Sequence, residues 1–140
     1  VGIWKLKSCK LITEEGQTLY PFGETPSGYL FYENHGFMSL HITRGPQKPN
    51  EATGLTDITA EEARDVLMDY FSYCGKYDVV ENTIYHYIEM STNPNWVGMA
   101  QERRCSLKDD VLTIQNPLSY EKKEVQLALV WQRAHGLESA

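Results

Sequence analysis

The sequence predicts a mainly β protein, an eight-stranded antiparallel up-and-down barrel with one α-helix. Three observations support this prediction: period-two alternation of apolar and polar residues through eight segments, helical periodicity in one other segment, and many Tyr, Trp, Val, Ile and Thr residues in the alternating runs. A two-sheet sandwich is the competing arrangement. We expect the whole chain, residues 1–140, to form a single domain.

The alternating segments give the bounds of the expected strands, and the turn residues between them give the connections. The strands are expected at residues 3–12, 28–33, 37–44, 76–81, 84–91, 98–107, 111–115 and 123–133. Tight turns are expected at 33–36, 81–83 and 108–110, and longer connections at 13–27, 45–75, 92–97 and 116–122. Connections alternate between the two ends of an up-and-down barrel. All the longer ones should therefore lie at one end, around the mouth of a ligand cavity.

The one helical segment is residues 59–75, between the third and fourth expected strands. Thr59 and Glu62 form a capping-box pattern, and Gly75 stands where a helix commonly ends. Apolar residues follow at helical spacing: Ala63, Val66, Leu67, Tyr70, Phe71 and Cys74. We expect this apolar stripe to pack against the barrel.

A cation–π contact is expected at the opposite end of the barrel. Trp4 begins the first expected strand and Arg133 ends the last one. The two residues meet if the barrel closes between those strands, and such a contact is worth about 0.5–2 kcal/mol. We interpret the pair as a structural plug.

Composition argues against several classes of function. The net charge of −6 disfavours nucleic acid and anionic membranes as partners, and no apolar run is long enough to span a bilayer. The three cysteines are far apart and show no metal-ligand spacing, so we expect reduced thiols, no metal, no cofactor and a cytoplasmic location. No signal peptide is visible, although the chain begins at Val1, which leaves a leader open. The oligomeric state is left open as well, with a homodimer as one possibility.

Several segments resemble one known family. Gly2-Ile3-Trp4 resembles the Gly-x-Trp that opens lipocalin first strands, and Arg133 resembles the arginine of their last strand. Residues 20–44, 70–79, 93–107 and 129–134 together resemble the lipocalin-like domain family of small bacterial and fungal proteins. The resemblance implies a calycin-type barrel with a helix before the fourth strand. Some members are associated with natural-product biosynthesis, and the family supplies no catalytic motif to carry over.

Alternation indicates which side chains face the interior once Trp4, Leu30 and Leu127 are placed inside. Ser8, Val79, Met90 and Cys105 then share the inner face, while His41 points outward. The mouth loops add Trp96 and Tyr120, which either stack on a ligand or pack on the helix. The predicted ligand-binding residues are Arg103, Gln101, His86, Tyr32, Tyr77, Arg44, Met38, Leu40, Leu129, Trp131 and Trp96.

Arg103 is the most informative of these residues, because a buried guanidinium needs compensation. One partner is a ligand carboxylate or enolate, bound through the planar fork. The alternative is an internal network of tyrosine hydroxyls, carbonyls and water. The predicted alternation brings no carboxylate to the inner face.

Three functional hypotheses remain open. The first is a barrel that binds a small, largely apolar molecule, optionally with an anionic or carbonyl oxygen facing Arg103. The second is an isomerase or cyclase acting on a polyketide-like intermediate, with His86 moving a proton and Arg103 stabilising an oxyanion as the catalytic residues. The third is a structural or interaction domain whose barrel is filled by its own side chains.

Overall fold

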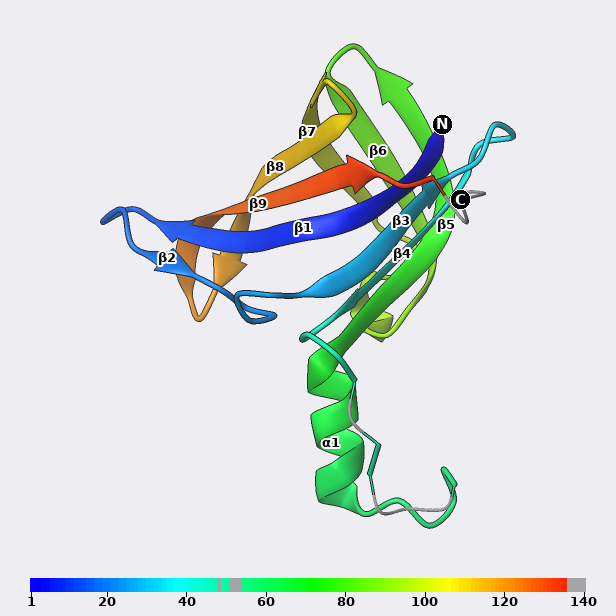
Figure 1. Cartoon of the computed structure of the whole chain (residues 1–140), viewed down its shortest axis with the longest axis vertical. Coiled ribbons are helices and arrows are strands. Elements are labelled where there is room, and N and C mark those ends of the chain that lie inside the picture. Colours follow the sequence, from blue (N-terminus) through cyan, green and yellow to red (C-terminus); the bar gives the residue numbers. More distant parts are fainter. Residues whose placement is uncertain (48, 51–53, 136–140) are drawn as a thin grey trace, which may run out of the picture.

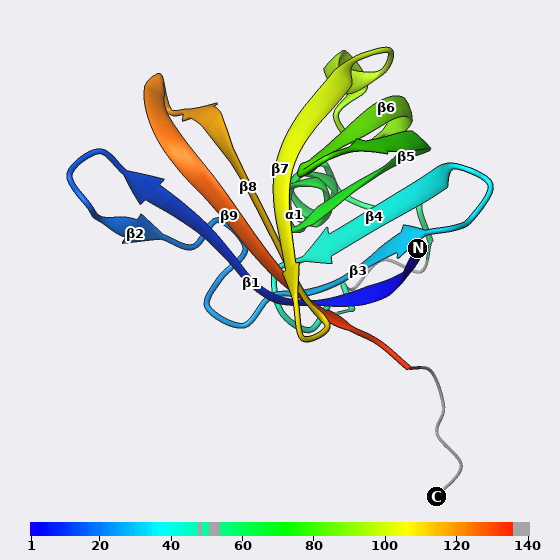
Figure 2. The ribbon, with the colours of Figure 1, turned by 90° about the horizontal axis from the view of Figure 1, so that it is seen from above.

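The computed structural model describes residues 1–47, 49–50 and 54–135. Eight long antiparallel strands and one two-residue strand form a single sheet in the order β2-β1-β3-β4-β5-β6-β7-β8-β9, and β1 also pairs with β9. This last pairing closes the sheet into a barrel (Figures 1 and 2). The elements are β1 Gly2–Thr13, β2 Thr18–Leu19, β3 Ser27–Tyr32, β4 Phe37–Thr43, α1 Ala60–Asp69, β5 Tyr70–Val80, β6 Thr83–Ser91, η1 Pro94–Trp96, β7 Ala100–Lys108, β8 Val111–Tyr120 and β9 Lys123–Arg133.

The predicted closed, mainly β barrel is confirmed, and the sandwich alternative is not observed. The position of the helix in the strand order needs a correction. The helix was expected between the third and fourth strands, but it follows β4, because the short β2 adds a strand that alternation over two residues could not reveal. Pairing of β2 with the end of β1 forms a small flap at the edge of the barrel.

The helix is shorter than predicted and its apolar stripe does not pack against the barrel. The capping box of Thr59 and Glu62 is confirmed, but α1 ends at Asp69 and Tyr70 is already extended. None of the residues of α1 is buried, and Leu67 and Met68 are 58% and 64% exposed. Figure 1 shows α1 projecting from the end of the barrel opposite the N-terminus. We call this end, which also carries η1, the mouth end.

Residues 70–75 were predicted as the last turns of the helix and instead begin β5. They pair with β4 on one side and, from Tyr73, with β6 on the other, so interstrand hydrogen bonds take the place of helical ones. Gly75, predicted as the helix stop, lies in the middle of β5. At this point β6 contains an extra residue, Glu89, between the partners of Cys74 and Gly75.

The predicted long connection at 116–122 is also wrong. Strand β8 continues to Tyr120, and a two-residue turn follows in which Glu121 and Lys122 have φ of 50° and 65°. Pro117 is tolerated inside β8 because it lies beyond Gln115, the last residue of this strand that pairs with β7. One of the four predicted mouth connections is therefore a tight hairpin.

Strand β7 divides its pairing between two neighbours. Residues 100–104 pair with β6, whereas residues 104–108 pair with β8. At the mouth end β7 and β8 are therefore not hydrogen-bonded to each other, and Figure 2 shows the two ribbons diverging there. The start of β7, which carries Gln101 and Arg103, thus borders an opening in the hydrogen-bonded wall.

Two bulges alter the predicted set of inward residues. In β1 the register shifts between Leu6 and Ser8, so that Cys9 and Leu11 are buried and Ser8 leaves the inner face. In β6 the bulge at Glu89 ends the inward series at Ile88, and the predicted inward Met90 is 68% exposed. A single inserted residue reverses the faces of a strand because side chains alternate with period two.

The predicted Trp4–Arg133 plug is confirmed. The guanidinium carbon of Arg133 lies 4.3 Å from the centroid of the buried Trp4 ring. Arg133 also donates to Asp110 Oδ1 at 3.0 Å and to the Val1 carbonyl at 3.2 Å. We call this end of the barrel the closed end.

Replacing Arg133 by alanine is expected to lower the free energy of unfolding by about 1–2 kcal/mol, because both the cation–π contact and the ion pair are lost. Urea unfolding at pH 7 measures the change. Arg104→Ala, at an exposed position on β7, is the matched control and should have little effect. Equal loss in the two variants would contradict a specific role for the plug.

In the described part of the chain, no helix has the length and apolar character required to span a bilayer.

Candidate ligand-binding cavity

The mouth half of the barrel encloses a cavity of about 250 Å³. This volume is slightly below the range of about 300–1,000 Å³ usual for drug-sized ligands, so it suits a smaller molecule. Residues from β1, β4, β5, β7, β8 and β9 line it, together with the β2–β3 loop and η1. The lining residues are Cys9, Leu11, Pro21, Phe22, Leu40, Ile42, Phe71, Tyr73, Trp96, Arg103, Leu118, Leu127 and Leu129.

An aromatic cluster forms one side of this cavity. Phe71 and Trp96 meet edge to face with ring centroids 5.1 Å apart, and Phe71 and Tyr73 meet similarly at 5.7 Å. Asn93 caps η1 by accepting a hydrogen bond from the Asn95 N–H, and this short turn carries Trp96 over the cavity. Trp96 therefore packs on the aromatic residues of β5.

Arg103 is the single charged residue of the cavity lining. Its side chain comes from β7, and the residue is only 6% exposed. Nη1 donates to Gln101 Oε1 at 3.2 Å, and the guanidinium acts electrostatically on the nearby Tyr73 phenol. No ion pair between two described residues involves Arg103. A charge buried in this way is costly unless another group neutralises it.

Below the cavity, His86 lies between two tyrosines. The Tyr32 hydroxyl is 2.5 Å from His86 Nε2, and the Tyr73 hydroxyl is 2.6 Å from Nδ1. Burial, with a further contribution from the Arg103 charge, lowers the pKa of His86 from 6.5 to about 3, so the imidazole is neutral at pH 7. In a neutral imidazole one nitrogen donates and the other accepts, so the two tyrosines use both.

The tyrosines connect this histidine to two different cavities. Tyr73 lines the mouth cavity, whereas Tyr32 lines a second cavity of about 270 Å³ at the closed end. Burial raises the pKa of both phenols, against the opposing effect of the Arg103 charge, so both remain protonated at neutral pH. The Tyr32–His86–Tyr73 chain is therefore a neutral partition between the two cavities.

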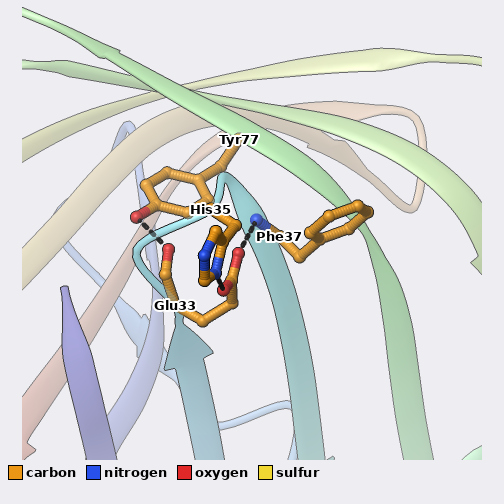
Figure 3. Close-up of polar contacts among 4 residues, drawn as sticks. All are labelled: Glu33, His35, Phe37 and Tyr77. Carbon is orange, nitrogen blue, oxygen red and sulfur yellow. Dashed lines mark hydrogen bonds and ion pairs between the residues drawn. The ribbon is translucent and has the colours of Figure 1, made fainter.

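Tyr77 also lies at the closed end. Its hydroxyl donates to the Glu33 carbonyl at 2.7 Å, as Figure 3 shows. Glu33 is the first residue of the β3–β4 turn, and its carboxylate accepts from the Phe37 N–H and contacts His35 Nδ1, each at 2.8 Å. The Tyr77 hydroxyl therefore uses its proton in a hydrogen bond to the β3–β4 hairpin.

The structure separates the predicted ligand-binding residues into groups. Leu40, Leu129, Trp96 and Arg103 line the mouth cavity, and Gln101 contacts Arg103. Tyr32 and Tyr77 line the closed-end cavity. Met38, His86 and Trp131 are buried but line neither cavity.

Arg44 was predicted to point into the barrel, and this prediction is wrong. It is exposed, donates to Asp69 Oδ1 at 3.0 Å and donates to the Pro21 carbonyl at 2.7 Å. The alternation used for the prediction ends one residue earlier, because β4 ends at Thr43. Arg44 instead connects the end of α1 to the β2–β3 loop.

Sequence reasoning missed several lining residues for identifiable reasons. Phe71 and Tyr73 were assigned to the helix, although odd-numbered residues from Phe71 to Val79 alternate in a strand-like manner. Cys9 was missed because of the β1 bulge, and Leu118 because residues 116–122 were expected to form a connection. No local signal places Phe22, which reaches the cavity from a loop.

Comparison with known proteins identifies a family and two similar proteins. The lipocalin-like domain family matches residues 1–134. The 4'-hydroxy-3'-methoxypropiophenone carrier protein ppsC of Aspergillus oryzae is 30% identical over 106 residues, which is 69% of this chain and 96% of that protein. A mutant of the fluorescent protein UnaG is 15% identical, with 96% of this chain and 95% of that chain covered, at a TM-score of 0.37. On the match of nearly its whole length, the chain belongs to the lipocalin-like domain family.

Proposed function

We propose that this protein binds and carries a small aromatic molecule in the mouth cavity, without chemical change, and that an oxygen of the ligand faces Arg103. One observation carries the proposal: an apolar, aromatic-walled cavity of about 250 Å³ contains a single buried guanidinium. An apolar pocket with a few placed polar groups is the usual form of a small-molecule site. The aromatic edges of Phe71 and Trp96 suit a planar ring.

The relative in Aspergillus oryzae supports this class of ligand. Its name describes a carrier of an aryl ketone with phenol and methyl ether groups. Such a molecule combines an aromatic ring with oxygens able to accept hydrogen bonds from a guanidinium. We extend the class of ligand, a phenolic or aryl-ketone compound, to the present chain.

The geometry favours binding over the alternative of an isomerase or cyclase. His86, the predicted base, does not line the mouth cavity, and both of its ring nitrogens are engaged by tyrosines. A general base must lie within hydrogen-bond reach of the proton that it removes. Arg103 lies in the cavity lining, where its guanidinium would face an oxygen of the bound molecule. This position suits a carrier as well as an enzyme.

Leu118→Trp tests whether the cavity is the binding site. Leu118 is partly exposed and lines the cavity, so the larger indole is expected to fill the empty volume and leave the barrel folded. Titration calorimetry with 4'-hydroxy-3'-methoxypropiophenone should show binding to the wild type and at least about tenfold weaker binding to the variant.

Leu55→Trp is the matched control, because Leu55 is 87% exposed and lies outside the cavity lining. It should bind the ligand as the wild type does. Unchanged affinity in Leu118→Trp, with circular dichroism showing a folded barrel, would place the ligand elsewhere. The proposed function would be overturned if the wild type bound neither 4'-hydroxy-3'-methoxypropiophenone nor related aryl ketones or phenols.

A further inference from the structure

The mouth cavity has an unusual charge balance. Arg103 is positively charged, and its contacts within the protein are to groups that carry no compensating charge. Gln101 is an amide, and the Tyr32–His86–Tyr73 chain is a network of neutral hydrogen bonds. Neutral dipoles orient toward a cation but leave its net charge in place.

The titratable groups packed around Arg103 come from five strands, and all are neutral near pH 7. Burial raises the pKa of Cys9 on β1 to about 12, and it raises the pKa values of Tyr32 on β3, Tyr73 on β5 and Cys105 on β7. His86 on β6 has its pKa lowered to about 3. Among the described residues, the surroundings of Arg103 thus supply no anion.

We infer that the mouth cavity selects the anionic form of its ligand, such as a phenolate or carboxylate, over a neutral carbonyl or ether. This inference rests on the proposed function, because it concerns the ionisation state of the same ligand. A neutral oxygen satisfies guanidinium N–H groups but leaves the buried charge, whereas an anion neutralises it through charge-assisted hydrogen bonds. When a phenol binds, its O–H bond breaks, the oxygen keeps the electron pair and the proton passes to the solvent.

Two probes of similar shape test this inference. 4-Nitrophenol changes colour on ionisation, and 4-nitroanisole, its methyl ether, cannot ionise. Spectrophotometric titration of 4-nitrophenol from pH 4.5 to 9 with excess wild-type protein should give a pKa for the bound phenol at least about one unit below that of the free phenol. This shift corresponds to at least about tenfold tighter binding of the phenolate than of the neutral phenol.

Arg103→Gln removes the charge and retains hydrogen-bond donors, and Arg104→Gln is the same change at the exposed neighbouring residue. The shift should disappear in Arg103→Gln and persist in Arg104→Gln. 4-Nitroanisole should bind Arg104→Gln with the affinity that it has for the wild type. If Arg103→Gln fails to fold, the pKa shift of bound 4-nitrophenol in the wild type and in Arg104→Gln still decides the question, with 4-nitroanisole reporting whether the cavity binds a neutral probe.

The outcomes separate this inference from the function on which it rests. If 4-nitroanisole binds and the bound 4-nitrophenol shows no lowered pKa, the anion preference is overturned and the proposed carrier function stands. The same shift in Arg103→Gln as in the wild type would also overturn the inference. If neither probe nor the aryl ketone binds, the proposed function fails and the inference fails with it.

Discussion

The barrel is expected to lose about 2–3 kcal/mol of stability between pH 7 and pH 4.5 through His86 alone. Its pKa in the folded protein is about 3, against 6.5 in the unfolded chain. Above pH 6.5 neither state binds the proton. Between pH 6.5 and pH 3 the unfolded chain binds a proton that the folded barrel excludes, so stability falls as the pH falls through this window. Below about pH 3 both states are protonated and the loss is complete.

Urea unfolding of the wild type and His86→Gln at pH 7 and pH 4.5 measures this contribution. The variant should be less stable at pH 7, because it disrupts hydrogen bonds to Tyr32 and Tyr73, but its stability should decline less on acidification. His41→Gln, on the outer face of β4, is the control and should retain the decline of the wild type. An identical decline in wild type and His86→Gln would show that His86 does not exclude the proton.

Gly75→Ala is expected to destabilise the barrel by about 3 kcal/mol or more. A Cβ added at Gly75 would overlap the Tyr87 carbonyl oxygen and would also contact the Glu89 nitrogen at 3.0 Å. Both are backbone atoms of the bulged part of β6, so no side-chain rotation relieves the overlap. The two strands would have to separate where β5 carries Tyr73 and β6 carries His86.

Thermal and urea unfolding measure this effect, with Gly54→Ala as the control. Among the described residues, a Cβ at Gly54 comes within 4 Å of Asp57 Oδ1 alone, at 3.9 Å, and the backbone φ of Gly54 is outside the left-handed region. The control should unfold within about 0.5 kcal/mol of the wild type. A Gly75→Ala protein as stable as the control would show that β6 shifts easily at the bulge.

Several predictions succeeded because they depended on patterns repeated over many residues. Alternation through β3 and β4 placed Leu30, Tyr32, Leu40 and Ile42 in the core, and all four are buried. The same regularity on β7 placed Arg103 inside and Arg104 outside. The sequence left open whether Arg103 contacts a ligand anion or an internal network, because the neighbours of Arg103 come from other strands, which no single segment contains.

The errors lie where one residue or one tertiary contact changes a local pattern. The region 70–75 carries apolar residues at both helical and strand spacing, and pairing with β4 and β6 decides in favour of the strand. Bulges at Lys7 in β1 and Glu89 in β6 exchange the inward and outward faces of these strands. No residue type in the neighbouring sequence indicates either bulge. Local propensity is weak compared with the hydrogen bonds and burial that a completed sheet supplies.

The sequence by itself determined the barrel, its Trp4–Arg133 plug and the inward direction of Arg103, because these follow from alternation and from closure between the first and last strands. Only the tertiary structure decided that His86 is enclosed by Tyr32 and Tyr73, and that Phe71, Tyr73 and Trp96 surround the cavity with Arg103. Those residues come from four strands and η1, which are spread along the chain. Their contacts depend on register, bulges and the split pairing of β7, which the folded sheet sets as a whole.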